Sequence, residues 1–153
     1  MKATLLFRIA AVLLLLFATG HTIGFLSFTP STPEGVAVRD AMSNVHFQVR
    51  NNTLSYGGFY RGFGLFVTAY LVFSALLAWQ LGSFAVKYSQ AVRPLAWMLC
   101  MVQIASLILS AIYFSGAPVI SSALVAACLG WASWRTRPSG VETPAFKAVE
   151  TAA

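Results

Sequence analysis

The sequence predicts an all-α protein, a four-helix transmembrane bundle with a short amphipathic helix in the first extracytoplasmic loop. The first observation is composition: of 153 residues, 58% are hydrophobic and 9% are charged, and the mean hydropathy is +0.75. The second is a set of four apolar runs near the ~20 residues that a helix needs to cross a bilayer. Such a chain is expected to be an integral membrane protein.

Four spans are expected, at residues 4–28, 56–84, 94–114 and 118–134. Pro94 and Pro118 are taken as first helical positions, where the N–H that proline lacks would have no partner anyway. The turn between the last two spans, FSGAP, is short, which predicts an antiparallel hairpin. Residues 1–137 are expected to form a single transmembrane domain, followed by a disordered cytoplasmic tail at 138–153, because that segment is small, polar and proline-bearing.

Basic residues set the expected orientation. Seven flank the spans on one side: Lys2, Arg8, Lys87, Arg93, Arg135, Arg137 and Lys147. The other side carries three: Arg39, Arg50 and Arg61. Because short basic flanks stay cytoplasmic, both termini are predicted to face the cytoplasm. The membrane is expected to be a bacterial inner (cytoplasmic) membrane, which is what the resemblance given below implies. The leucine-rich start also suggests a signal peptide, but the apolar run continues past Ala18 to Phe28, so cleavage is not expected.

The largest segment outside the spans is residues 29–55, where an amphipathic helix is expected at about 33–50. Thr32, Pro33 and Glu34 form an N-cap, a first-position proline and a first-turn acid. Apolar residues then recur at helical spacing: Val38, Met42, Val45 and Val49. This pattern predicts a helix that lies along the outer membrane surface.

Small residues mark the outer ends of the first two spans. Gly20 and Gly24 form one small-xxx-small pattern, and Gly58 and Gly62 form another, followed by Gly64. Such patterns let backbones approach closely inside a membrane. We therefore expect these two spans to touch near their outer ends, which brings His21 and Arg61 to similar depth.

The third span carries a polar stripe that is expected to face into the bundle. Its members are Cys100, Gln103, Ser106 and Ser110, and it ends near Tyr113. The fourth span offers a smooth face of small residues for tight packing: Ser122, Ala126 and Gly130.

The polar residues inside the spans allow two interpretations. In the functional one, a ligand-binding pocket opens to the outer leaflet and is lined by His21, Arg61, Gln103, Ser110 and Tyr113. Ionisable groups in a membrane cost several kcal/mol unless paired or wet. Arg61 would then be the charged donor and His21 a hydrogen-bond partner for a phosphate, a carboxylate or a quinone-like carbonyl.

The structural interpretation needs no ligand. His21 hydrogen-bonds a carbonyl or a serine of a neighbouring helix. Arg61 extends to the headgroups or pairs with Asp40 or Glu34, and the Gln103 stripe fixes the bundle.

Two motifs carry a resemblance. GHTIGF closes the first span and GGFYRGFGL opens the second, and together they resemble a family of small, uncharacterised four-helix bacterial integral membrane proteins with GHT ending helix 1 and GFG opening helix 2. The resemblance runs roughly from Thr4 to Trp134. The matching positions are Gly20, His21, Thr22, Gly62, Phe63 and Gly64. It implies a four-helix transmembrane bundle, and it supplies no activity and no catalytic residue.

The favoured function is a non-enzymatic inner-membrane protein that binds a lipid or another small amphiphile in the outer-leaflet pocket. No acid and base pair lies within the spans, and the loops are too small for a soluble active site. The alternative is a membrane-embedded enzyme acting on a lipid, quinone or sterol-like substrate, with His21 as acid or base. The expected partners are membrane lipids and a small amphiphile, and a homo-oligomer is left open.

Other classes are disfavoured. Nucleic acid is not an expected partner, because the basic residues are scattered around the apolar runs. No cofactor or metal is expected, since paired histidine ligation of haem needs two facing histidines and His46 lies outside the spans. Cys100 and Cys128 form no Cys-x-x-Cys pair, which argues against disulfide chemistry. A transporter has weak support, because the chain shows no inverted repeat.

Overall fold

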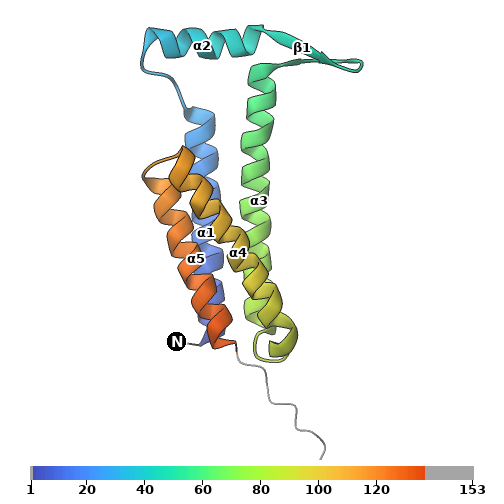
Figure 1. Ribbon diagram of the computed structural model, residues 1–153, viewed down its shortest axis with the longest axis vertical. Coiled ribbons are helices and arrows are strands. Elements are labelled where there is room, and N and C mark those ends of the chain that lie inside the picture. Colours follow the sequence, from blue (N-terminus) through green and yellow to red (C-terminus); the bar gives the residue numbers. More distant parts are fainter. Residues whose placement is uncertain (1, 137–153) are drawn as a thin grey trace, which may run out of the picture.

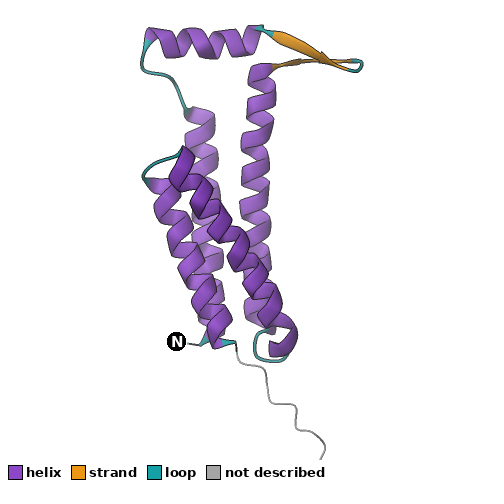
Figure 2. Ribbon diagram, viewed as in Figure 1, coloured by secondary structure: helices purple, strands orange, loops and turns teal. Residues whose placement is uncertain are grey.

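The computed structural model describes residues 2–136, so the expected tail at 138–153 lies outside the described part (Figure 1). Five helices and one two-stranded hairpin make up this part (Figure 2). In chain order they are α1 (Ala3–Ser27), α2 (Pro33–Asn44), β1 (His46–Val49), β2 (Asn52–Ser55), α3 (Tyr56–Phe84), α4 (Ser89–Tyr113) and α5 (Ala117–Arg135).

The four helices α1, α3, α4 and α5 are long and apolar enough to cross a membrane. The predicted fold class is therefore confirmed, and the chain is an integral membrane protein with four candidate spans. α2 and the hairpin lie across one end of these helices, which we call the α2 end (Figure 1). We call the opposite end the basic end, because it carries Lys2, Arg8, Lys87, Arg93 and Arg135.

Helix α1 is the centre of the packing. It contacts α3 along most of its length and α5 more briefly, while α4 packs mainly on α5 and touches α3 only in part. Alanine and leucine dominate the buried face, as at Ala10, Ala78 and Ala132, which are fully buried. Small side chains suit this setting, because in lipid the helices associate through close packing and not through a hydrophobic driving force. Large apolar side chains instead cover the outside, where lipid tails surround them.

The segment outside the membrane helices differs from the prediction. The N-cap is confirmed, since Thr32 Oγ1 accepts a hydrogen bond of 3.1 Å from the Gly35 N–H. The helix expected at 33–50 nevertheless ends at Asn44, and His46–Val49 pairs antiparallel with Asn52–Ser55. The stretch HFQV alternates polar and apolar residues, the period of a strand.

The hairpin turn also has a physical basis. Arg50 and Asn51 form a two-residue connection between Val49 and its partner Asn52, and Arg50 has a positive φ of 55°. Tight two-residue hairpin turns require this left-handed backbone. The hairpin then rests on the start of α3, where the ring of Phe47 lies 4.7 Å from that of Tyr56 and 5.8 Å from that of Phe59.

Helix α4 begins earlier than predicted. Pro94 was expected as its first residue, but the helix starts at Ser89 and contains Pro94. Proline inside a helix removes one backbone hydrogen bond, which has a cost. The inward stripe extends upstream of it: the buried residues at helical spacing are Ser89, Val92, Ala96, Leu99 and Gln103. Burial of this continuous face explains why the helix tolerates the proline.

Candidate functional site

His21 makes a specific contact between the first two spans. Its Nε2 lies 3.1 Å from the carbonyl oxygen of Gly64 on α3, and its ring stacks on Phe25 with centroids 5.7 Å apart. A carbonyl oxygen only accepts, so Nε2 carries the hydrogen and donates it. A Cβ at Gly64 would overlap the ring of Phe25 in its present position, so a larger residue here would make that ring move. The predicted contact between the outer ends of these spans is therefore present, but it forms at Gly64. A Cβ added to Gly20, Gly24 or Gly62 would have no atom within 4 Å, so the two small-xxx-small patterns do not make the contact.

A second polar contact involves the next residue of α1, and its partner lies one turn further along α3 than Gly64. The Thr22 hydroxyl donates to the carbonyl oxygen of Ala18 at 2.8 Å, and its oxygen lies 2.8 Å from the hydroxyl oxygen of Thr68 on α3. The Thr68 hydroxyl also lies 3.5 Å from the carbonyl oxygen of Gly64, so either threonine can be the donor between the two. His21 and Thr22 thus join α1 to α3 with two hydrogen bonds.

Arg61 lies on α3, about one turn nearer the α2 end than Gly64. Its side chain is exposed, and within residues 2–136 no carboxylate pairs with it. The two acids of this described part are both in α2, where Asp40 is 3.3 Å from Arg39. The structure therefore leaves the guanidinium of Arg61 without the Asp40 or Glu34 partner that sequence reasoning considered.

Gln103 belongs to a different network. Its side chain is 1% exposed, and its Nε2 donates to the Tyr70 hydroxyl oxygen at 2.7 Å. That hydroxyl oxygen lies 3.2 Å from Ser106 Oγ, and Ser106 itself donates to the carbonyl oxygen of Val102 at 3.0 Å. Tyr70 must therefore donate to Ser106. This chain of hydrogen bonds joins α4 to α3 about two turns deeper than Gly64.

The remaining predicted residues lie near the end of α4. Ser110 is buried, as the inward stripe requires, together with Cys100 and Gln103. Tyr113 is 73% exposed at the last position of the helix.

The structure brings His21 and Arg61 to within about one helical turn of each other along α3. Within residues 2–136, however, no hydrogen bond or ring contact joins any two of the five predicted site residues. The geometry thus divides them between the α1–α3 contact at the α2 end and the deeper α3–α4 network. Sequence reasoning missed Tyr70, because nothing in the run TAYLVF shows which face of α3 meets α4.

The small-residue face of α5 packs as predicted. Cys100 Sγ lies 3.7 Å from the carbonyl oxygen of Ala126, and a Cβ added to Gly130 would be 3.5 Å from the same sulfur. Both cysteines are free thiols.

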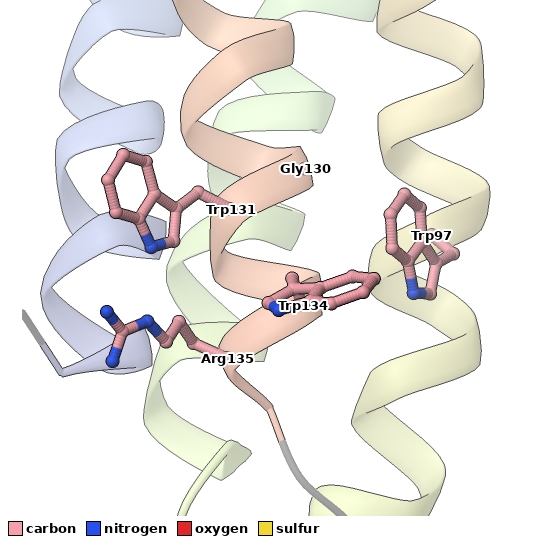
Figure 3. Close-up of a pocket in the computed structure, with 5 residues that line it drawn as sticks. All are labelled: Trp97, Gly130, Trp131, Trp134 and Arg135. Carbon is pink, nitrogen blue, oxygen red and sulfur yellow. The ribbon is translucent and has the colours of Figure 1, made fainter.

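A surface groove lies at the basic end, and it was not foreseen. Its volume is about 720 Å³, and it is lined by Trp97, Gly130, Trp131, Trp134 and Arg135 (Figure 3). A smaller hollow of about 290 Å³ lies at the turn between α3 and α4. None of the five predicted site residues lines either one. The clue in the sequence is WASWR, two tryptophans and an arginine that close the fourth span.

Within the part of the chain that the structure describes, no group of three histidine, cysteine or acidic residues could hold a metal ion. Comparison of the chain with protein-family models, with curated proteins and with solved structures finds no match. The likeness to four-span membrane proteins therefore rests on the four long apolar helices, and no particular family is assigned.

Proposed function

We propose that this membrane protein is non-enzymatic and binds a lipid or another small amphiphile at the α2 end, beside the contact between α1 and α3. The observation that carries the proposal is Arg61. It is an exposed basic residue near the α2 end of α3, with no carboxylate partner among residues 2–136. A phosphate or carboxylate headgroup would supply the missing partner through charge-assisted hydrogen bonds.

The surroundings of Arg61 support an amphiphile over a simple anion. Tyr60, Phe63 and Phe66 are exposed on the same part of α3. The ring of Tyr60 lies 5.4 Å from that of Phe25, which continues the stack on His21. The turn between α4 and α5 stops short of the upper end of α3, so it does not cover the first turns of that helix (Figure 1). An apolar tail could lie against these rings while the headgroup meets Arg61.

The orientation is part of the proposal. Among the described residues, the basic end has five cations and no acid, and the α2 end has three cations and two acids. Positive flanks favour the cytoplasm, so the α2 end would face the extracytoplasmic leaflet of a bacterial inner membrane. Reporter fusions to residue 50 and to residue 153 test this: the first should report an outside location and the second a cytoplasmic one. The reverse pattern would contradict it.

The direct test is lipid extraction and native mass spectrometry of the purified protein. Arg61→Gln should lower the amount of the co-purifying molecule about tenfold, as expected for loss of a charge-assisted hydrogen bond. Arg39→Gln is the matched control, because it removes the same charge from the same end but from a residue already paired with Asp40. An unchanged amount in Arg61→Gln would overturn the proposal.

The second candidate is an enzyme acting on a lipid, quinone or sterol-like substrate with His21 as acid or base. One observation specifies which nitrogen of His21 would act. Nε2 donates to the Gly64 carbonyl oxygen, so Nδ1 is the nitrogen that would exchange a proton. Comparison of lipid extracts from cells that produce the wild type and cells that produce His21→Gln separates the two candidates. A lipid species formed only with the wild type would favour the enzyme, and identical extracts would favour binding alone.

A further inference from the structure

We propose a second lipid site, for an anionic glycerophospholipid in the leaflet at the basic end, in the groove between α4 and α5. This inference is independent of the function proposed for the α2 end. It uses other residues, another end of the bundle and another leaflet.

The volume of the groove is in the range of known ligand sites. Its volume of about 720 Å³ falls in the range of ~300–1,000 Å³ that is typical of sites for small molecules. In Figure 3, Trp131 and Arg135 project from the side of α5 that faces away from α4, while Trp134 points across toward Trp97 on α4, so the groove extends over the exposed face of α5. Gly130 lies between them and has no side chain to fill the space.

The basic end carries only positive side chains among the described residues, which favours an anionic ligand. Both acids of the described part lie in α2, so none of residues 2–136 at the basic end carries a negative side chain. The guanidinium of Arg8 lies 4.7 Å from the ring centre of Trp79, and the ammonium of Lys87 lies 5.2 Å from that of Tyr88. Arg135 is exposed at the last position of α5. Basic pockets between membrane helices on the cytoplasmic side of a membrane bind anionic headgroups.

The tryptophans explain why the anion would be a lipid. Trp131 is 58% exposed and Trp134 is 73% exposed, far more than indole rings in a protein core. In Figure 3 the ring nitrogens of Trp97 and Trp131 lie on the side toward the end of α5. Tryptophans at a membrane boundary place the ring among acyl chains and the N–H among headgroups. A phosphate beside Arg135 would therefore have its acyl chains against these rings.

Arg135 and Trp131 provide the headgroup contacts in this arrangement. The two residues are four apart, so they share one face of α5. A guanidinium binds phosphate through two parallel hydrogen bonds, and an indole N–H can add a third. A soluble phosphate ion could accept the same hydrogen bonds, but it has no acyl chains to lie against the apolar faces of the tryptophan rings.

The test is titration of the full-length protein in detergent micelles, with bound lipid counted by native mass spectrometry. Phosphatidylglycerol and phosphatidylcholine with identical acyl chains are compared, because they differ in net charge. The wild type should bind phosphatidylglycerol more tightly. Arg135→Gln should weaken phosphatidylglycerol binding about tenfold and leave phosphatidylcholine binding unchanged, and Arg135→Lys should fall between the two. Inorganic phosphate in excess should not displace the bound lipid.

Arg8→Gln is the matched control. Arg8 is exposed at the same end but lies against Trp79 of α3 and does not line the groove, so its loss should change phosphatidylglycerol binding less than twofold. Arg61→Gln should have no effect, which separates this site from the one at the α2 end. Equal losses in Arg8→Gln and Arg135→Gln would overturn the inference, because they would indicate general attraction to a basic surface. Equal binding of the two lipids by the wild type, or displacement by phosphate, would overturn it as well.

Discussion

The interface between α1 and α3 is built differently at its two ends. At the basic end, a Cβ added to Gly82 would lie 3.0 Å from the Cβ of Phe7 and 3.3 Å from the Thr4 carbonyl oxygen, and Phe7 is fully buried. At the α2 end, Gly64 faces the half-buried ring of Phe25, and a hydrogen bond from His21 accompanies the contact. A side chain added at Gly82 would therefore meet atoms that are part of the α1 backbone or bonded to it. A side chain added at Gly64 would meet a phenylalanine ring that can rotate.

This difference indicates which end of the α1–α3 interface can change its packing. Atoms close to the backbone cannot move without moving a helix, whereas the far end of a phenylalanine near a helix terminus can take another rotamer. The α2 end is thus the part of the interface that can adjust to a ligand. The basic end instead fixes how the two helices cross.

Gly82→Leu should have the largest effect and tests whether the basic end of the interface is rigidly packed. The new side chain has no free space against Phe7, so we expect a loss of about 3 kcal/mol in the free energy of unfolding, at the upper end for overpacking. Reversible unfolding in mixed micelles measures it. Gly62→Leu on the same helix is the control, because no atom lies within 4 Å of its added Cβ, and it should change stability by less than about 1 kcal/mol. Similar values for the two variants would contradict the packing described here.

Gly64→Leu sharpens the comparison at the other end. The ring of Phe25 has to move and the His21 hydrogen bond is weakened, so we expect a smaller loss of about 1.5 kcal/mol. Adding Phe25→Ala should recover part of that loss by making room. If Gly64→Leu costs as much as Gly82→Leu, or if Phe25→Ala brings no recovery, the α2 end is not the adaptable one.

Gln103→Leu tests the deeper network and should have the smallest effect. It removes the 2.7 Å hydrogen bond to Tyr70, while the Tyr70 hydroxyl keeps its contact with Ser106. Hydrogen bonds between membrane helices contribute about 0.6 kcal/mol on average, and we expect a loss of that size or slightly more. A double-mutant cycle with Tyr70→Phe should give a coupling energy of similar size. Strictly additive losses would show that the two side chains do not interact.

Much of the fold could be predicted, because the bilayer sets the length of each span. The first two spans differ from α1 and α3 by at most one residue at either end. The predicted start of α4 at Pro94 was wrong. Proline only prefers the first position of a helix, and the burial of Val92 and Ala96 outweighs that preference. The hairpin was missed because Val45 and Val49 fit a helical spacing, while Phe47 and Val49 equally fit the alternation of a strand.

The candidate site could be predicted only in part. Spacing shows that His21 lies near the outer end of a span, but its partner is a backbone oxygen, which no sequence pattern marks. The inward stripe at Gln103 was predictable from helical periodicity. Its partner Tyr70 was not, because α4 meets only part of α3 and the rotation of one helix against another is a tertiary property.

The central claim is that the α2 end of α3, around Arg61, holds the amphiphile. The most direct measurement is photo-crosslinking in cells supplied with a diazirine-bearing fatty acid, followed by mapping of the labelled peptides. We predict label concentrated on residues 56–67, reduced several-fold in Arg61→Gln and unchanged in Arg39→Gln. Label spread evenly over the lipid-facing surface, with no dependence on Arg61, would contradict the account.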